Sequence, residues 1–173
     1  MIKKALIVID MQNDYYPQGA MELVGIIKAN ENVNELISDF REGGDEVIFI
    51  QHIASRNAPF FRKGSDGAKL FDGLDIKTSD VVFEKHYPNS FRDTDLDKYL
   101  QNKEIGKLVI CGAMTHMCID TTVRAGFDLG YNIDLVANAC ATKDLAYNGE
   151  VIKADLVHKS FLSALNGTFC EMI

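Results

Sequence analysis

The sequence predicts an α/β protein with a three-layer, Rossmann-like fold, in which helices cover both faces of a central, mostly parallel six-stranded sheet. Two observations carry this prediction. Short, continuous apolar runs recur along the 173 residues, which is the pattern of strands buried on both faces. Segments with helical periodicity lie between these runs, and such strand–helix alternation is typical of parallel sheets.

The strands are expected where β-branched and large apolar residues follow one another without interruption. The first such run begins four residues after the N-terminal methionine, and the last expected strand lies at the C-terminus. The predicted strands are Ala5–Ile9, Glu46–Ile50, Asp80–Phe83, Lys107–Cys111, Asn132–Val136 and Phe169–Ile173.

Two helices are expected between the first four strands. Apolar residues from Ile26 to Phe40 follow a spacing of three and four, and Gly43-Gly44 ends that helix. The second helix is expected to begin at Thr94-Asp95-Leu96-Asp97, which resembles a capping box.

Two further helices are expected in the C-terminal half. The third presents a face that includes small residues, from Thr122 to Leu129, and Gly130 ends it. The fourth runs from Ala154 to Leu165 and stops at Asn166-Gly167. The long stretch from Gln51 to Ser79 matches no element, and a loop of this length is more often an active-site cover or a subunit contact than disorder.

Composition places further bounds on the protein. We expect one domain over residues 1–173, because a chain of this size can bury a full core. The net charge is −7 without any Lys/Arg block, which disfavours nucleic-acid binding. No apolar run approaches the roughly 20 residues of a membrane span, and the first strand is too short for a secretory signal, so we expect a cytoplasmic protein that binds no membrane. The four widely spaced cysteines are expected to be free thiols.

In open α/β sheets, ligands bind outside the carboxyl ends of the strands. This rule directs attention to the residues that follow each apolar run, and three of them have side chains suited to acyl transfer: Asp10, Lys85 and Cys118. Each also has a plainer interpretation. Asp10 is equally suited to capping a turn, a lysine at a strand end is usually a solvated charge, and a lone cysteine is usually a small core residue.

Cys118 lies between the fourth strand and the third helix. Unpaired N–H groups and the helix dipole favour a thiolate at a helix N-terminus, so we expect the pKa of this thiol to be lowered. The same N–H groups can hold the oxyanion of a tetrahedral intermediate. Among the histidines, His158 is interpreted as structural, His116 as structural or on the substrate side, and His52 and His86 stay open. The sequence contains no dinucleotide, P-loop or zinc motif, so no cofactor is expected.

Taken together, three segments resemble the isochorismatase-like cysteine hydrolases, a family that includes nicotinamidases, ureidoacrylate hydrolases and isochorismatases. They are Val8–Tyr15, Lys85 with Ser90-Phe91, and Cys111–Cys118. The resemblance continues through Thr121–Gly126, Gly130-Tyr131 and Ala139–Thr142, and it spans nearly the whole chain in the family's order.

The resemblance implies a catalytic triad of Asp10, Lys85 and Cys118, with Cys118 attacking an amide-type carbonyl. It also implies a cis peptide between Ala113 and Met114, which would aim the Met114 N–H at the oxyanion. Substrate contacts are expected from Gln12, Tyr15, Tyr16, Phe91 and Thr115, and the neighbouring Phe60 or Phe61 is a further candidate wall.

The sequence departs from parts of the family. Nicotinamidases hold a metal through Asp-x-His and a further histidine, whereas the corresponding stretch here is Ile50–Ala54, with His52 alone, so no metal is expected. Isochorismatases that cleave vinyl ethers generally lack the cysteine. Because family members usually assemble, we expect a homo-oligomer that acts on a small molecule.

Three alternatives to the cysteine amidohydrolase stay open. The first is hydrolysis of a vinyl ether. The second is a redox pair formed by Cys111 and Cys118 without hydrolysis. The third is a catalytically idle oligomeric scaffold.

Overall fold

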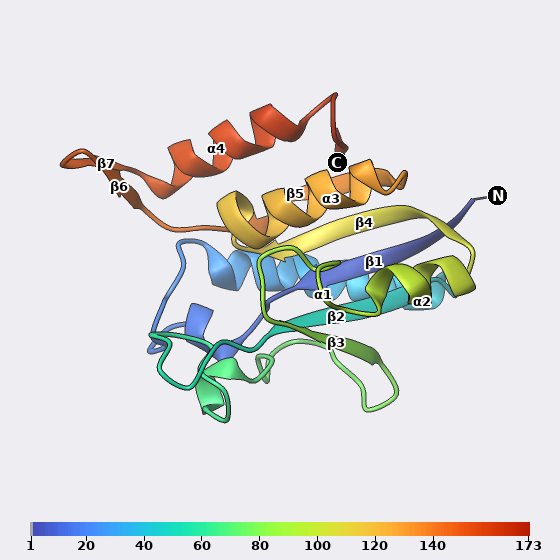
Figure 1. Cartoon of the computed structure of the whole chain (residues 1–173), viewed down its shortest axis with the longest axis horizontal. Helices are drawn as coiled ribbons and strands as arrows, with labels where there is room; N and C mark the ends of the chain where they lie inside the picture. The colour runs from blue at the N-terminus through green and yellow to red at the C-terminus, as the bar shows by residue number, and fades with distance from the viewer. Residues whose placement is uncertain (1) are drawn as a thin grey trace.

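The computed structural model describes residues 2–173 and contains a six-stranded sheet in the order β3-β2-β1-β4-β5-β8, with every neighbouring pair parallel. This confirms the predicted α/β fold and its sheet (Figure 1). The strands are β1 (Lys3–Ile9), β2 (Glu46–His52), β3 (Val81–Lys85), β4 (Ile105–Ala113), β5 (Asn132–Ala141) and β8 (Glu171–Met172).

The order of the strands creates a switch point at the centre of the sheet. From β1 the chain adds β2 and then β3 on one side, and it then crosses back to place β4 on the other side of β1. The segments that leave the carboxyl ends of β1 and β4 therefore diverge, and a crevice at such a point is the usual ligand site of open α/β sheets.

Helices cover both faces of the sheet, as predicted. Helix α1 (Ile26–Glu42) packs on one face, and α2 (Leu96–Asn102), α3 (Asp120–Asp128) and α4 (Ala154–Leu165) belong to the other (Figure 1). None of the helices within residues 2–173 has the length and apolar character needed to cross a membrane.

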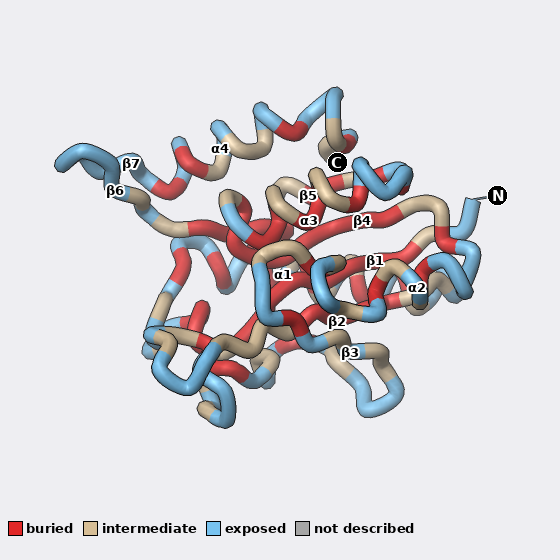
Figure 2. The backbone as a smooth tube through the Cα atoms, viewed as in Figure 1, coloured by how far each residue is buried: buried red, intermediate tan, exposed pale blue. Residues whose placement is uncertain are grey.

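Alternating residues of β1 supply the two hydrophobic cores on either side of the sheet. Leu6 and Val8 pack with Val33 and Ile37 of α1. The residues between them, such as Ile7, belong to the core that includes α2 and α3. Burial on both faces explains why this strand is a continuous apolar run, and Figure 2 shows the central strands as the buried part of the chain.

Two local features differ from the sequence prediction. Helix α2 begins at the expected place, but the capping box does not form: Thr94 Oγ1 accepts from the Leu96 N–H at 3.4 Å and not from that of Asp97, and the Asp97 carboxylate accepts from Tyr131 and Gln101. The connection between β5 and α4 contains a two-stranded hairpin that the sequence analysis missed, β6 (Leu145–Tyr147) and β7 (Glu150–Ile152). It projects from the body of the protein and is largely exposed (Figure 2).

The switch point depends on a close approach between β1 and β4. Gly112 has a φ of +118°, and a Cβ atom at this position would lie 2.1 Å from the Ile9 carbonyl oxygen. Both atoms belong to the backbone, so no side chain can rotate to make room. Only glycine fits here without separating the two central strands.

We therefore expect Gly112→Ala to destabilise the protein by about 3 kcal/mol, the combined scale of left-handed strain and overpacking. Gly130→Ala is the matched control, because Gly130 also has a positive φ, +93°, but nothing lies within 4 Å of the added atom. It should cost about 1–2 kcal/mol. Urea unfolding measures the free energy of unfolding of both variants. Equal losses of stability would contradict the inference that the close approach of β1 and β4 requires glycine at position 112.

Candidate active site

The carboxyl edge of the sheet brings together polar side chains from β1, β2, β3 and the segment after β4. Asp10 follows β1 directly, while His52 and Lys85 end β2 and β3 and are register partners. Cys118 lies in η3 (Thr115–Ile119), a π-helical turn that connects β4 to α3. The structure thus places the three residues of the predicted triad in one cluster, together with a histidine.

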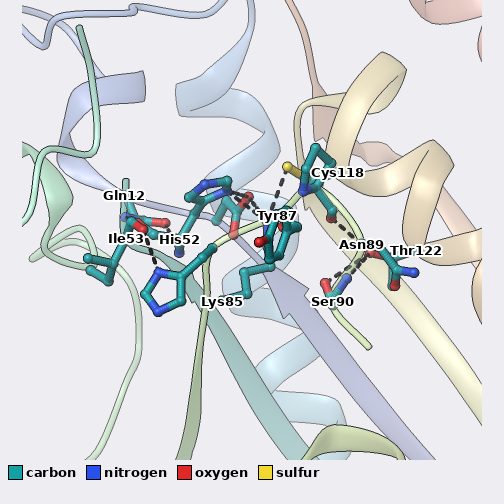
Figure 3. A network of polar contacts seen from close by, with 12 residues as sticks. Gln12, His52, Ile53, Lys85, Tyr87, Asn89, Ser90, Cys118 and Thr122 are labelled. Carbon is teal, nitrogen blue, oxygen red and sulfur yellow. Dashed lines mark hydrogen bonds and ion pairs between the residues drawn. The ribbon is translucent and has the colours of Figure 1, made fainter. Parts of the chain in front are cut away.

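The Lys85 ammonium group is the centre of this cluster. Its Nζ lies 2.8 Å from Asp10 Oδ2, 3.0 Å from His52 Nδ1 and 3.2 Å from Cys118 Sγ. It also donates to the Tyr87 carbonyl at 3.1 Å. Figure 3 shows these contacts as dashed lines that converge from His52, Tyr87 and Cys118.

Hydrogen bonds between neighbouring elements hold the groups that surround the ammonium. The Ser90 N–H donates to Thr122 Oγ1 on α3 at 3.1 Å, and the two hydroxyl groups share a hydrogen bond at 2.9 Å, which ties down the segment that carries the Tyr87 carbonyl. The next residue after Lys85, His86, contacts the Ile53 carbonyl at 2.8 Å. The position of the ammonium is therefore set from several elements at once.

Asp10 is fully buried and has a φ of +53°, in the left-handed region that a non-glycine residue rarely adopts. Its N–H continues the pairing with β2 by donating to Ile50 O at 3.0 Å. Its Oδ2 accepts from Lys85, whereas Oδ1 has no hydrogen-bond partner among residues 2–173. A buried carboxylate oxygen without a partner is costly, and it is available to accept a proton.

The thiol of Cys118 is only 4% exposed. Burial and the nearby Asp10 carboxylate raise its pKa above the ordinary value, and Lys85 offsets this only in part. The expectation of a lowered thiol pKa is therefore wrong. The position at the start of a helical segment does not compensate for the loss of water and for a second negative group close by.

Lys85 has the opposite balance. Burial by itself would lower its pKa, but attraction to Asp10 and to Cys118 outweighs burial, so the net shift is upward. Lys85 is therefore an ammonium ion at neutral pH. With Asp10 as a carboxylate and Cys118 as a thiol, the buried charges cancel, which is the arrangement that burial tolerates best.

His52 is a member of the cluster that the sequence analysis left open. Burial and the neighbouring Lys85 lower its pKa to about 4, against a weaker opposing effect of Asp10. The imidazole is therefore neutral at pH 7. Because an ammonium can only donate, His52 Nδ1 must be the nitrogen that accepts, and the ring proton resides on Nε2. The feature of the sequence that could have identified His52 as a site residue is its position just after the predicted strand Glu46–Ile50.

Met114 lies where β4 turns into η3, and the Ala113–Met114 peptide bond is cis. The Met114 carbonyl accepts from the N–H groups of Met117 and Ile119. Its own N–H donates to no backbone or side-chain acceptor within residues 2–173. This N–H is therefore a free donor one turn before Cys118.

Gln12, one of the expected substrate contacts, is bonded within the protein. Its side chain is fully buried, accepts from the His52 N–H at 2.7 Å, and donates to the carbonyls of His52 and Ala68 at 2.9 and 2.7 Å. Gln12 thus fixes the end of β2 to the loop around η2 (Asp66–Ala68).

Three other expected substrate contacts also point elsewhere. Tyr16 stacks on Phe71 and donates to Asn30, in the core beside α1. Thr115 is fully buried and contacts His158 and the Ala141 carbonyl. Phe91 stacks on Tyr131 beside α3. The contacts of these three side chains are therefore with other parts of the protein, outside the set of residues that surrounds the Lys85 ammonium.

Tyr15 is the expected contact that lies at the cluster. Its ring packs against Phe61 and Phe60 of the long loop, with centroids 4.5 and 6.1 Å apart. Burial is the main cause that raises the pKa of its phenol, and the nearby Asp10 carboxylate acts in the same direction. Phe61 is held in turn by its N–H, which donates to Asp14 Oδ2 at 2.6 Å. The loop thus covers one side of the site, as its length suggested.

The donor atoms of Asp10, His52 and Cys118 lie within 4.8 Å of one another, a spacing that suits a metal ion. Lys85 Nζ lies within 3.2 Å of an atom of each of the three, so an ammonium already uses the groups that would bind the ion. A metal here would have to displace a buried ammonium that already neutralises the carboxylate. The cluster therefore does not fit a metal ion.

The chain is similar in sequence and structure to known proteins. Residues 4–167 match the isochorismatase domain. The uncharacterized isochorismatase family protein YddQ of Bacillus subtilis (strain 168) is 43% identical over 97% of this chain and 94% of its own length. A crystal structure of a protein from Oleispira antarctica that is assigned to the same family is 44% identical, with a TM-score of 0.94 over 98% of this chain and 92% of that one.

Two further relatives carry names that refer to activity. The ureidoacrylate amidohydrolase RutB of Acinetobacter baylyi is 29% identical over 79% of this chain and 69% of its own length. A probable inactive nicotinamidase of Arabidopsis thaliana is 35% identical over 79% of this chain and 80% of its own length. Active and inactive proteins therefore both occur among the relatives.

The low pKa of His52 predicts how stability depends on pH. Between pH 6.5 and about 4 the unfolded chain binds a proton at this residue that the folded protein excludes, so stability falls as the pH falls. Because asparagine does not titrate, we expect His52→Asn to lose this part of the pH dependence of the free energy of unfolding. The loss should amount to up to about 3 kcal/mol between pH 6.5 and about 4. Urea unfolding at pH 4.5–7 measures it. Parallel curves for the two proteins would contradict a buried neutral His52.

Proposed function

The chain belongs to the isochorismatase family, and from this membership we propose that it is a cysteine hydrolase that cleaves an amide-type C–N bond in a small molecule. One observation carries the proposal. A buried ammonium, Lys85, lies within hydrogen-bonding distance of both a carboxylate, Asp10, and a thiol, Cys118. That set contains a proton acceptor, a nucleophile and a charge that stabilises either anion.

In the proposed first half-reaction, Asp10 accepts the thiol proton while the sulfur of Cys118 attacks the carbonyl carbon. The unpaired Oδ1 of Asp10 is the natural acceptor. The negative charge that develops on the carbonyl oxygen is stabilised by backbone N–H groups, with Met114 as the principal donor. As the intermediate collapses, the C–N bond breaks and the proton moves from Asp10 to the departing nitrogen, leaving a thioester.

In the second half-reaction, a water molecule gives a proton to Asp10 and its oxygen attacks the thioester carbonyl. The C–S bond then breaks, and the sulfur recovers its proton from Asp10. The net reaction consumes one water and yields a carboxylic acid and an amine. Lys85 keeps its charge throughout, because it stabilises first the Asp10 carboxylate and then the departing thiolate.

An amide is favoured over a vinyl ether because the cluster contains a sulfur nucleophile beside the acid–base group. The amidohydrolase name of the Acinetobacter relative supports this choice. Tyr15 and the loop residues Phe60 and Phe61 suit a small, partly planar substrate. The vinyl-ether alternative makes a different prediction, since it releases pyruvate and no amine.

The redox alternative has little support from the structure. All four cysteines are free thiols. Cys111 packs in the core on the α1 side of the sheet, whereas Cys118 packs in the core on the opposite side. The two sulfurs therefore face away from each other across β4. The idle-scaffold alternative is addressed by the activity tests that follow.

We expect Cys118→Ala to fold normally and to lose hydrolysis of an amide panel by on the order of a thousand-fold or more, because the nucleophile is absent. Intact-protein mass spectrometry should also show an acyl adduct on the wild type that this variant cannot form. Cys170→Ala is the control, since Cys170 lies outside the cluster. A Cys118→Ala variant with wild-type turnover would refute the proposal, and a wild type inert toward every C–N substrate would favour the scaffold.

We expect Asp10→Asn to have opposite effects on two properties of the same sulfur. Amide hydrolysis should be lost, because no group accepts or returns the proton. The pKa of the Cys118 thiol should fall by about 1–3 units, because the negative neighbour that raises it is removed. Iodoacetamide labelling between pH 7 and 10, followed by peptide mass spectrometry, measures the thiol. Asp66→Asn, at an exposed position, is the control, and slower labelling in Asp10→Asn would contradict this account.

A further inference from the structure

We propose that His52 is a positioning residue that occupies one of the three Lys85 N–H groups and thereby keeps Cys118 protonated in the resting site. The proposal rests on the proposed function only in taking Cys118 as the nucleophile. It assigns His52 no contact with the substrate, and it concerns how the hydrogens of one ammonium group are shared among its neighbours.

Lys85 has fewer hydrogens to donate than it has acceptors around it. An ammonium has three hydrogens to donate. Four acceptors lie within 3.2 Å of Lys85 Nζ: Asp10 Oδ2, His52 Nδ1, the Tyr87 carbonyl and Cys118 Sγ. The Lys85 side chain is fully buried, so water does not compete for these hydrogens. One acceptor must therefore go without a hydrogen at any moment.

Chemistry decides which acceptor goes without. A carboxylate, a carbonyl and an imidazole lone pair are all strong acceptors, whereas the sulfur of a neutral thiol is a weak one. The three hydrogens therefore belong to Asp10, His52 and Tyr87 in the resting state. A thiolate at Cys118 could gain a hydrogen from Lys85 only if Asp10, His52 or Tyr87 lost one, and this cost favours the sulfur that retains its own proton.

His52 is built into the structure in a way that suits this role. Its backbone is clamped by Gln12, which accepts from its N–H and donates to its carbonyl. Its ring lies beside Phe61, with centroids 5.9 Å apart. These contacts fix the His52 backbone at the end of β2 and place an aromatic ring beside the imidazole that contacts Lys85.

The charged and titratable groups that face His52 come from every neighbouring element. Asp10 Oδ2 lies 3.9 Å from Nδ1 after β1, Lys85 and His86 lie on and after β3, and Cys118 lies on η3. Protonation of Nδ1 would set two cations against each other across 3.0 Å. The neutral ring is therefore the form that accepts from Lys85, in agreement with the lowered pKa of His52.

This arrangement couples two events in the proposed reaction. When Asp10 takes the thiol proton it becomes neutral and needs the Lys85 hydrogen less. His52 and Tyr87 keep their two hydrogens, so the third is free to turn from Asp10 to the new thiolate. The sulfur is thus activated only when Asp10 is protonated. Without an acceptor at position 52, a hydrogen would be available to the sulfur at all times.

The test compares His52→Leu, which removes the acceptor, with His52→Asn, whose side-chain oxygen can take the place of Nδ1. We measure the iodoacetamide labelling rate of Cys118 from pH 7 to 10 by peptide mass spectrometry, with Cys170 as an internal reference. We expect His52→Leu to label about tenfold faster than wild type at a fixed pH below both midpoints, which corresponds to a fall of about one unit in the thiol pKa. His52→Asn should follow the wild type.

Unchanged or slower labelling in His52→Leu would overturn the proposal, and so would equally fast labelling in both variants. A second measurement covers the case in which His52→Leu does not fold. ¹⁵N chemical shifts of wild-type His52 should show an unprotonated Nδ1 and a protonated Nε2 at pH 7, and the reverse tautomer or an imidazolium would overturn the proposal. Neither readout needs a substrate, so hydrolysis retained in Cys118→Ala would refute the proposed function without touching this result.

Discussion

The buried ammonium of Lys85 is the interaction on which the rest of the site depends. Moving an ion of this size out of water costs several kcal/mol even after the protein relaxes, so the charge must be neutralised and its hydrogens must be used. Asp10 supplies the opposite charge, and His52 and the Tyr87 carbonyl complete the hydrogen bonds. The protonation states of Cys118 and His52 follow from this, because one cation and one anion already balance.

The fold makes this concentration of polar groups possible. Strands β1, β2 and β3 end at one edge of the sheet, and each contributes a polar residue to the cluster there. In β1 and β2 that residue follows buried apolar ones, whereas β3, at the edge of the sheet, alternates exposed and less exposed residues before the buried Lys85. The left-handed φ of Asp10 turns the chain at that edge, and the glycine at position 112 lets β4 approach β1 closely enough to bring η3 alongside. The cores on both faces keep the strand ends in register, which a cluster held together at 2.8–3.2 Å requires.

Much of this could be predicted from the sequence, because parallel strands leave a strong pattern. The apolar runs and the rule about carboxyl ends were enough to single out Asp10, Lys85 and Cys118. The direction of a side chain was harder to predict, because neighbouring residues point to different sides of the chain. A shift of one position therefore decides whether a side chain enters the site or a core. Gln12, Tyr16, Phe91 and Thr115 all lie in the right segments and point elsewhere. His52 was undervalued because its partnership with Lys85 depends on the register of β2 and β3, which the sequence does not state.

The raised pKa of the Cys118 thiol is where a prediction from the helix terminus alone failed. It also suggests how the thiol can be unreactive at rest and still serve as a nucleophile. A helix terminus favours a thiolate when the sulfur faces water. Here the sulfur faces a carboxylate in a dry pocket, so the stable pair is thiol and carboxylate, and ionisation of the sulfur requires protonation of Asp10. In the reaction we propose, Asp10 would then hold the proton that the leaving nitrogen needs. We expect a thiol held in this way to resist oxidants and alkylating agents, because these react with thiolates. On this proposal, the buried charge pair of Lys85 and Asp10 keeps the sulfur protonated until a substrate is bound.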